Sequence, residues 1–341
     1  MKHNINILAL CLLAMASCAK VTVEQDGGPM AFSIGEGQDT RALAEFSDKM
    51  ESDGRKFGVY ATKSGKDVFK SQPQPVTYYS STPVGWFYYG HKTYEAAPEE
   101  YETWNRGSTY KFRAWYPYEY SPHTTSSSDL LTFDGFSLFV DNLDLMVAYE
   151  ERVPSSQGTD EVKMKFRHAL AAVCFKVQYK DGVKPADAVD YVTSAWLSGV
   201  CATGTFAFGK VSSSDAADKM QWIVSTPGSR KLHEWTPARE TDKPFKVPDG
   251  PDDATCAVDV YAESSDPGYV FVIPQTLGSG AAFNFTTKAS GSAVFTAQLP
   301  GNEWECGKKY TYTISVSASG IEVEVSIKPW EELASGWDVF I

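Results

Sequence analysis

The sequence lacks the residue spacings on which common catalytic and metal sites depend. Only five histidines occur in 341 residues, and no two of them form an HExxH or HxH pair. A GxSxG nucleophile elbow, a phosphate-binding loop ending in Gly-Lys-Ser and a dinucleotide fingerprint are all absent. We therefore expect no enzymatic activity, no metal and no cofactor.

Basic residues and cysteines are also few. The chain has 31 lysines and arginines against 43 aspartates and glutamates, a net charge of -12, so we expect no nucleic-acid partner. Four of the six cysteines lie beyond residue 18, and their separations fit no zinc motif. Cys174, Cys201, Cys256 and Cys306 allow more than one disulfide pairing, but buried free thiols are the state that we expect.

No apolar run is long enough to cross a bilayer as a helix, which takes about 20 residues. A shorter apolar run covers residues 5–16. It follows Lys2 and ends in small residues before Cys18, which is typical of a secretory signal. We predict a signal peptide at residues 1–17. The letters MASC resemble a bacterial lipobox, with Met15 in place of the more usual leucine, so Cys18 is the predicted lipidation site. Acyl chains such as palmitate would hold the precursor at the outer membrane. An ordinary signal with a chance cysteine is the alternative.

Helical periodicity is nearly absent from the rest of the chain. Short runs of alternating, aromatic and β-branched residues recur instead, bounded by Gly, Pro, Ser, Asn and Asp, which is the pattern of an all-β sandwich. The clearest runs are residues 56–61, 110–118, 172–179, 203–209, 269–274 and 309–318. In the last run Tyr310, Tyr312, Ile314 and Val316 share one face and Thr or Ser residues the other, which predicts a half-buried strand.

A polar loop at residues 153–161 is the best candidate linker. It divides the mature chain into two segments of ordinary domain size. We expect the first domain to end at residue 158 and the second to cover residues 159–320.

Both ends of the chain carry alternating segments. Residues 21–37 place Met30, Phe32 and Ile34 on one face of a predicted strand, which could fill an apolar groove. Residues 321–341 form an amphipathic ribbon that is interrupted at residues 329–335. Its apolar residues are Ile321, Val323, Val325, Ile327, Trp330, Trp337, Val339 and Ile341.

An aromatic segment at residues 85–120 has two interpretations. Exposed rings could stack on sugars or protein partners, or the rings could fill the core of the first domain. Trp86, Tyr88 and Trp104 are the residues that distinguish these interpretations.

Six segments in order resemble the fimbrillins, the subunits of the type V pili of Gram-negative anaerobes. They are KFGVYA, DLMVA, MKFRHALAAVCFKV, FVIPQT, WECGKKYTYTISVS and IKPWEE. The resemblance covers essentially the whole mature chain. It implies two tandem transthyretin-like β-sandwich domains and a structural role in cell adhesion.

The resemblance also implies a mechanism of assembly. In fimbrillins an N-terminal strand fills a groove until an arginine- or lysine-specific protease cuts behind it, and the C-terminal extension of another subunit then replaces it. Arg41, followed by Ala42, lies where that cut would fall, so residues 18–41 are the expected propeptide and residues 42–158 the mature first domain. Residues 321–341 are then the expected donor strand.

The preferred function is a shaft subunit of a fimbrium at the cell surface. Its expected partners are further copies of itself, together with anchor and tip subunits. The alternative is a monomeric surface lipoprotein, an anchor or a tip adhesin, that binds a glycan or a host protein.

Overall fold

The computed structural model describes residues 28–34, 50–120, 129–138, 144–154, 161–180, 190–234 and 269–329. The predicted signal peptide and several predicted site residues lie outside these ranges, namely Cys18, Arg41, Ala42, Trp330, Trp337, Val339 and Ile341. No helix among the described residues is long and apolar enough to span a membrane.

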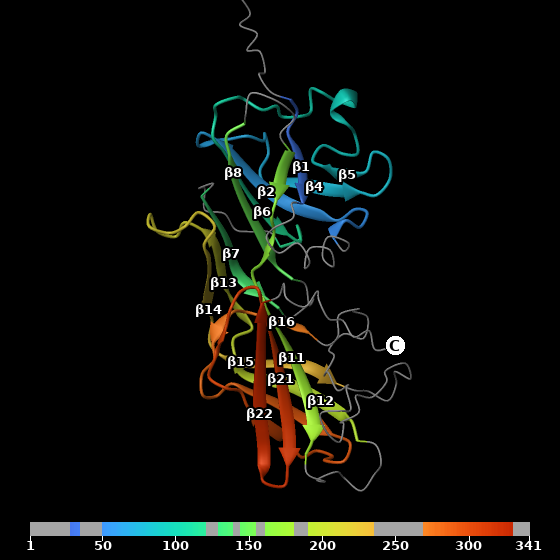
Figure 1. The fold of residues 1–341 in the computed structure, drawn as a ribbon, viewed down its shortest axis with the longest axis vertical. Coiled ribbons are helices and arrows are strands. Elements are labelled where there is room, and N and C mark those ends of the chain that lie inside the picture. The colour runs from blue at the N-terminus through green and yellow to red at the C-terminus, as the bar shows by residue number, and fades with distance from the viewer. Residues whose placement is uncertain are drawn as a thin grey trace, which may run out of the picture.

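Strands make up nearly all the regular structure (Figure 1), which confirms the all-β sandwich prediction. In the first half of the chain they are β1 (Ala31–Ile34), β2 (Lys56–Lys63), β3 (Lys66–Asp67), β4 (Gln74–Tyr79), β5 (Gly85–Phe87), β6 (Tyr110–Tyr116), β7 (Leu130–Ser137), β8 (Met146–Arg152), β9 (Glu161–Met164) and β10 (Arg167–His168). A short 3-10 helix, η1 (Tyr94–Ala96), lies between β5 and β6.

The second half continues with β11 (Ala171–Tyr179), β12 (Val192–Val200), β13 (Thr203–Gly209), β14 (Met220–Val224), β15 (Gly228–Glu234), β16 (Val270–Val272), β17 (Gln275–Thr276), β18 (Ala282–Thr287), β19 (Phe295–Gln298), β20 (Glu303–Trp304), β21 (Lys308–Ser317) and β22 (Gly320–Pro329).

The largest sheet has nine strands in the order β10-β8-β6-β2-β4-β5-β1-β9, with β3 paired to β2. The two ends of this sheet lie close together. Arg152 is at the end of β8, next to the edge strand β10, and it donates a hydrogen bond to the carbonyl of Glu161 at the start of β9, the other edge strand. The inner face encloses an aromatic core that includes Phe57, Trp104 and Phe112. We call this part of the molecule the β6 region.

Two four-stranded sheets form a second sandwich, which we call the β21 region. Their orders are β16-β11-β21-β22 and β15-β12-β18-β19. The core between them contains Phe175 stacked on Phe283, with ring centroids 4.2 Å apart. Tyr310, Tyr312 and the other predicted inward residues of β21 are buried, as their alternation with Thr and Ser predicts.

A third sheet, β14-β13-β7, joins strands from both halves of the chain. It covers the outer face of the nine-stranded sheet, where Trp115 and Val147 pack against Phe133, Phe206 and Phe208. In Figure 1 these strands lie at mid-height between the two ends of the molecule.

Hydrogen-bonded strand pairs cross the predicted domain boundary at residue 158. β9 and β10, which the sequence analysis assigned to the second domain, pair with β1 and β8, and β13 pairs with β7. The physical reason is the alternation in β9, where Val162 and Met164 are fully buried between exposed Glu161 and Lys163. That apolar face packs in the core of the nine-stranded sheet, so strand pairing crosses the predicted boundary at residue 158.

The β6 and β21 regions share a local motif, W-x-x-G-x-x-Y, which begins at Trp104 and again at Trp304. In both copies the glycine has a positive φ, 73° and 68°, which turns the chain into the following strand. The tyrosine hydroxyl then accepts a 2.9 Å hydrogen bond from the backbone N–H after the tryptophan. The glycines and tyrosines are Gly107 and Tyr110 in the first copy and Gly307 and Tyr310 in the second.

Candidate functional site

The N-terminal strand β1 lies inside the nine-stranded sheet, not at its edge. It pairs in parallel with β9 over the whole of residues 31–34, and antiparallel with β5 at Phe32 and Trp86. The residues just before it are held as well. The Met30 N–H donates to the carbonyl of Glu102 at 2.8 Å, and the Trp104 N–H donates to the carbonyl of Gly28 at 3.1 Å.

The side chains of this segment enter the core of the β6 region. Met30 is 0% exposed and Phe32 3% exposed, whereas Ala31 between them faces solvent. Ile34 is partly buried and packs against the same core. The structure thus places all three predicted groove-filling residues on one side of the strand.

Phe32 lies at the centre of a group of aromatic rings. Its ring is edge-on to Tyr88 at 5.7 Å, to Phe112 at 5.8 Å and to Phe57 at 6.2 Å between centroids. Such pairs contribute about 0.5–1.5 kcal/mol each beyond the area that they bury. Removing residues 28–34 would leave an apolar groove between β5 and β9 with unpaired backbone groups along both sides.

A tyrosine hydroxyl helps to order the wall of this groove. Tyr88 is 4% exposed, and its oxygen accepts a 3.0 Å hydrogen bond from the Glu102 N–H. Burial raises the pKa of Tyr88 well above its ordinary value, so the hydroxyl stays neutral. The groove therefore presents neutral aromatic surface to whichever strand occupies it.

At the other end of the chain, β22 belongs to the sheet of its own molecule. It pairs antiparallel with β21 from Gly320 to Pro329. Ile321, Val323 and Val325 are partly buried against the core of the β21 region, while Ile327 is 47% exposed. The first part of the predicted donor ribbon is thus a strand of this subunit. Within the described residues β22 ends its sheet, which leaves one side of its backbone as an open edge.

The aromatic segment is mainly core. Trp86, Tyr88 and Trp104 are 8%, 4% and 1% exposed, so the core interpretation is confirmed for the residues that distinguished it. At the surface, His91 stacks on Tyr79 with centroids 4.2 Å apart. Trp86, Tyr88 and Trp104 therefore offer almost no exposed surface on which a glycan or a protein partner could bind.

The thiols and histidines do not form a reactive centre within the described part of the chain. Cys201 is buried, and its Sγ donates to the carbonyl of Ser225 at 2.9 Å. Burial raises the pKa of Cys306 to about 11, which keeps the thiol protonated and unreactive. His168 contacts Asp144, and no group of three or more potential metal ligands occurs among the described residues.

These features define an all-β sandwich protein whose N-terminal strand completes a sheet built from distant parts of the chain. The fimbrillin-like family matches residues 40–330, so the chain belongs to that family. Its members are structural proteins of fimbriae and cell adhesion, and are not enzymes. Membership supports a role as a fimbrial subunit that associates with other subunits at the cell surface.

Solved structures share the fold at low sequence identity. A protein assigned to cell adhesion from Bacteroides uniformis is 20% identical, with a TM-score of 0.53 over 82% of this chain and 92% of that one. A fimbrial protein from Bacteroides vulgatus is 15% identical, with a TM-score of 0.51 over 89% of this chain and 99% of that one. No curated protein matches the chain.

Proposed function

We propose that this protein is a shaft subunit of a type V pilus that polymerises by strand exchange. It is exported as a precursor with a lipid on Cys18, cut between Arg41 and Ala42, and assembled when the strand of another subunit replaces residues 28–34. The observation that carries this proposal is the position of β1. It lies between β5 and β9 with Phe32 in the core, yet only residues 35–49, which include Arg41, join it to Met50.

Cleavage after Arg41 breaks this covalent connection and none of the contacts of β1. The cut strand stays in place through its hydrogen bonds to β9 and β5 and through the buried rings around Phe32. Exchange is therefore slow and needs a competing strand that restores both the backbone pairing and the apolar contacts. The same cut releases the mature subunit from the lipid on Cys18.

The donor is the part of the ribbon that follows β22. Ile321, Val323 and Val325 pack on their own core, so using β22 as donor would require it to separate from β21 along its whole length. Residues 330–341 carry Trp330, Trp337, Val339 and Ile341 and are longer than the segment that they would replace. We therefore assign the donor role to these last residues, with β22 as their connection to the subunit body.

The test is assembly by an Arg41→Ala variant. The expected result is a stable, folded, lipid-held monomer that forms no fibres in electron micrographs after protease treatment. Arg106→Ala is the matched control, because Arg106 is an exposed arginine in the turn before β6, and this variant should assemble normally. Fibres of normal length from Arg41→Ala, with residues 18–41 still attached, would show that the cut is not required.

A further inference from the structure

The outer face of the nine-stranded sheet changes from apolar to polar along β2, β6 and β8. Three cross-strand rows follow from the register, and their members are Gly58, Trp115 and Val147, then Tyr60, Arg113 and Tyr149, then Thr62, Lys111 and Glu151. The first row is covered by the sheet that contains β7 and β13. The third row extends beyond that cover and forms the floor of an open cavity of about 370 Å³.

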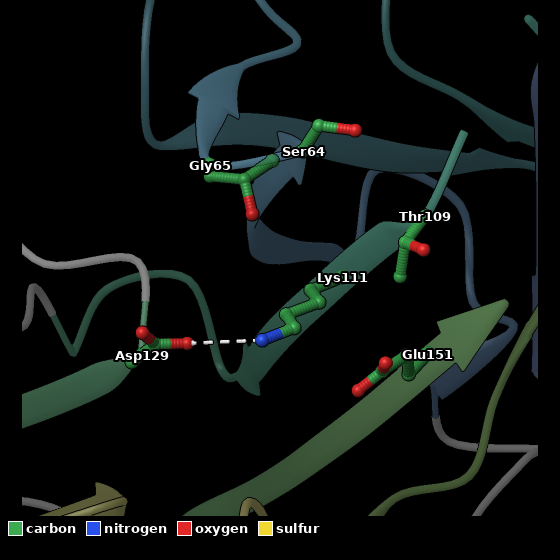
Figure 2. Close-up of a pocket in the computed structure, with 7 residues that line it drawn as sticks. Ser64, Gly65, Thr109, Lys111, Asp129 and Glu151 are labelled. Carbon is green, nitrogen blue, oxygen red and sulfur yellow. Dashed lines mark ion pairs between the residues drawn. The ribbon is translucent and has the colours of Figure 1, made fainter.

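Four different parts of the chain line this cavity (Figure 2). The turn between β2 and β3 contributes Ser64 and Gly65, and the residue before β6 contributes Thr109. Asp129, just before β7, lies on the opposite side, and its Oδ1 is 3.6 Å from the Nζ of Lys111. Figure 2 shows the Lys111 side chain reaching toward Asp129, with Glu151 on the neighbouring strand.

The Glu151 carboxylate is held in place by a packed chain of side chains. Its Oε2 accepts a 2.5 Å hydrogen bond from the hydroxyl of Tyr149. Burial and this carboxylate both raise the pKa of Tyr149, so the hydroxyl remains a donor. The guanidinium of Arg113 lies 4.5 Å from the centre of the Tyr149 ring and donates to the carbonyl of Ala217 at 2.7 Å. Glu151 is thus oriented before any ligand arrives.

The charges of the cavity argue against a charged ligand. An anion would face the carboxylates of Asp129 and Glu151, and a cation would face the ammonium group of Lys111. The cavity instead alternates donors and acceptors, since the ammonium group only donates, the carboxylates only accept, and the threonine and serine hydroxyls do both. The methyl group of Thr109 and the methylene chain of Lys111 add short apolar contacts.

We propose that this cavity binds a neutral saccharide unit. Adjacent ring hydroxyls of a sugar can donate to Glu151 and Asp129 while accepting from Lys111, and the C–H face of the ring can lie on the methyl group of Thr109 and the methylene chain of Lys111. The site lies on the outer face of the sheet, away from the core that holds β1. Its function therefore does not depend on strand exchange between subunits.

The test is calorimetric titration of the purified protein with free hexoses, N-acetylhexosamines and their disaccharides. We expect at least one neutral sugar to bind, and Lys111→Met and Glu151→Gln each to weaken its Kd at least tenfold. The matched controls are Lys70→Met and Glu99→Gln, which remove the same charges at exposed positions outside the cavity and should leave the Kd unchanged.

Two charged probes, inorganic phosphate and a lysine tripeptide, test the electrostatic argument. Neither should bind in a way that depends on Lys111 or Glu151. The proposal is overturned if no sugar binds, if both cavity variants bind the sugar as well as the unmodified protein, or if a charged probe is the ligand that these variants lose. Thermal unfolding midpoints within a degree or so of the unmodified protein would show that the variants are folded.

Discussion

The β6 and β21 regions contain the same local motif but complete their sheets in different ways. In the β6 region, the strand after W-x-x-G-x-x-Y pairs with β2 and β8, and the sheet includes β1 from much earlier in the chain. In the β21 region, the corresponding strand pairs with β11 and β22, and β22 ends the sheet within the described residues. One region takes in a remote strand, while the other presents an open edge.

This difference gives the subunit two unlike ends. A strand that enters a sheet from a distant part of the chain can be replaced without refolding its neighbours, because no tight hairpin joins it to them. A region that continues beyond an edge strand can extend toward another molecule. Unlike ends of this kind suit head-to-tail contacts, which generate filaments when the rotation between subunits does not close.

Removing the end of the C-terminal ribbon should have the largest effect on the head-to-tail assembly of subunits. Deleting residues 337–341 takes away Trp337, Val339 and Ile341, and burial of each apolar side chain is worth about 1.5–3 kcal/mol. Fibres counted by electron microscopy should be nearly absent, while the monomer keeps its thermal unfolding midpoint. Asp338→Asn, which changes a residue between the apolar positions, should assemble normally. If the deletion also lowered the thermal unfolding midpoint of the monomer, these residues would belong to the subunit's own core.

The next largest effect should come from the strand that the β6 region takes in. Phe32→Ala in the uncut protein should lower the free energy of unfolding by about 3–5 kcal/mol, because the ring is 3% exposed and surrounded by other rings. Denaturant unfolding measures this loss, and Ala31→Ser at the neighbouring exposed position is the control. A loss no larger than that of Ala31→Ser would mean that β1 does not stabilise the core.

Local alternation predicted a large part of this architecture. The β21 strand and the apolar face of Met30 and Phe32 follow from side chains pointing to opposite sides of an extended chain. The glycine and tyrosine of W-x-x-G-x-x-Y were also visible, since comparing the chain with itself aligns Trp104 with Trp304.

Pairing between distant strands could not be predicted in the same way. The alternation in β22 predicts a strand, but it does not say whether the partner is β21 of the same subunit or a strand of another. The join between β7 and β13 and the position of β9 beside β1 depend on which apolar faces meet in three dimensions. The saccharide cavity depends on the same register, because Lys111 and Glu151 come together only when β6 pairs with β8.

A smaller effect, of the same order for both variants, is expected from the two copies of the motif. Tyr110→Phe and Tyr310→Phe each remove the hydroxyl that accepts the backbone hydrogen bond, so each should lower the free energy of unfolding by about 0.5–1.5 kcal/mol. Tyr310 also donates to the carbonyl of Glu303 at 2.7 Å, which places its loss toward the upper end of that range. Denaturant unfolding of both variants tests the correspondence. If only one variant loses stability, the two motifs are alike in sequence but do not stabilise their regions in the same way.

The smallest effect on stability is expected from an ion pair that connects β22 to the end of β11. Lys180, just after β11, forms a 2.8 Å ion pair with Glu322 on β22, and the side chains are 42% and 55% exposed. Lys180→Gln should therefore lower stability by only about 0.2–1 kcal/mol at low salt, and high salt should remove the difference. Lys92→Gln, which breaks the exposed pair with Glu100 in the β6 region, is the matched control.

The same variant distinguishes two ways of supplying the donor strand. If β22 had to leave its own sheet before exchange, weakening its ion pair would speed the growth of fibres relative to Lys92→Gln. If only the residues after β22 enter the neighbouring subunit, the two variants should grow fibres at equal rates, because the contacts of β22 with β21 do not change during assembly. We expect equal rates, measured by light scattering after protease addition. Faster growth of Lys180→Gln alone would extend the donor back to Ile321.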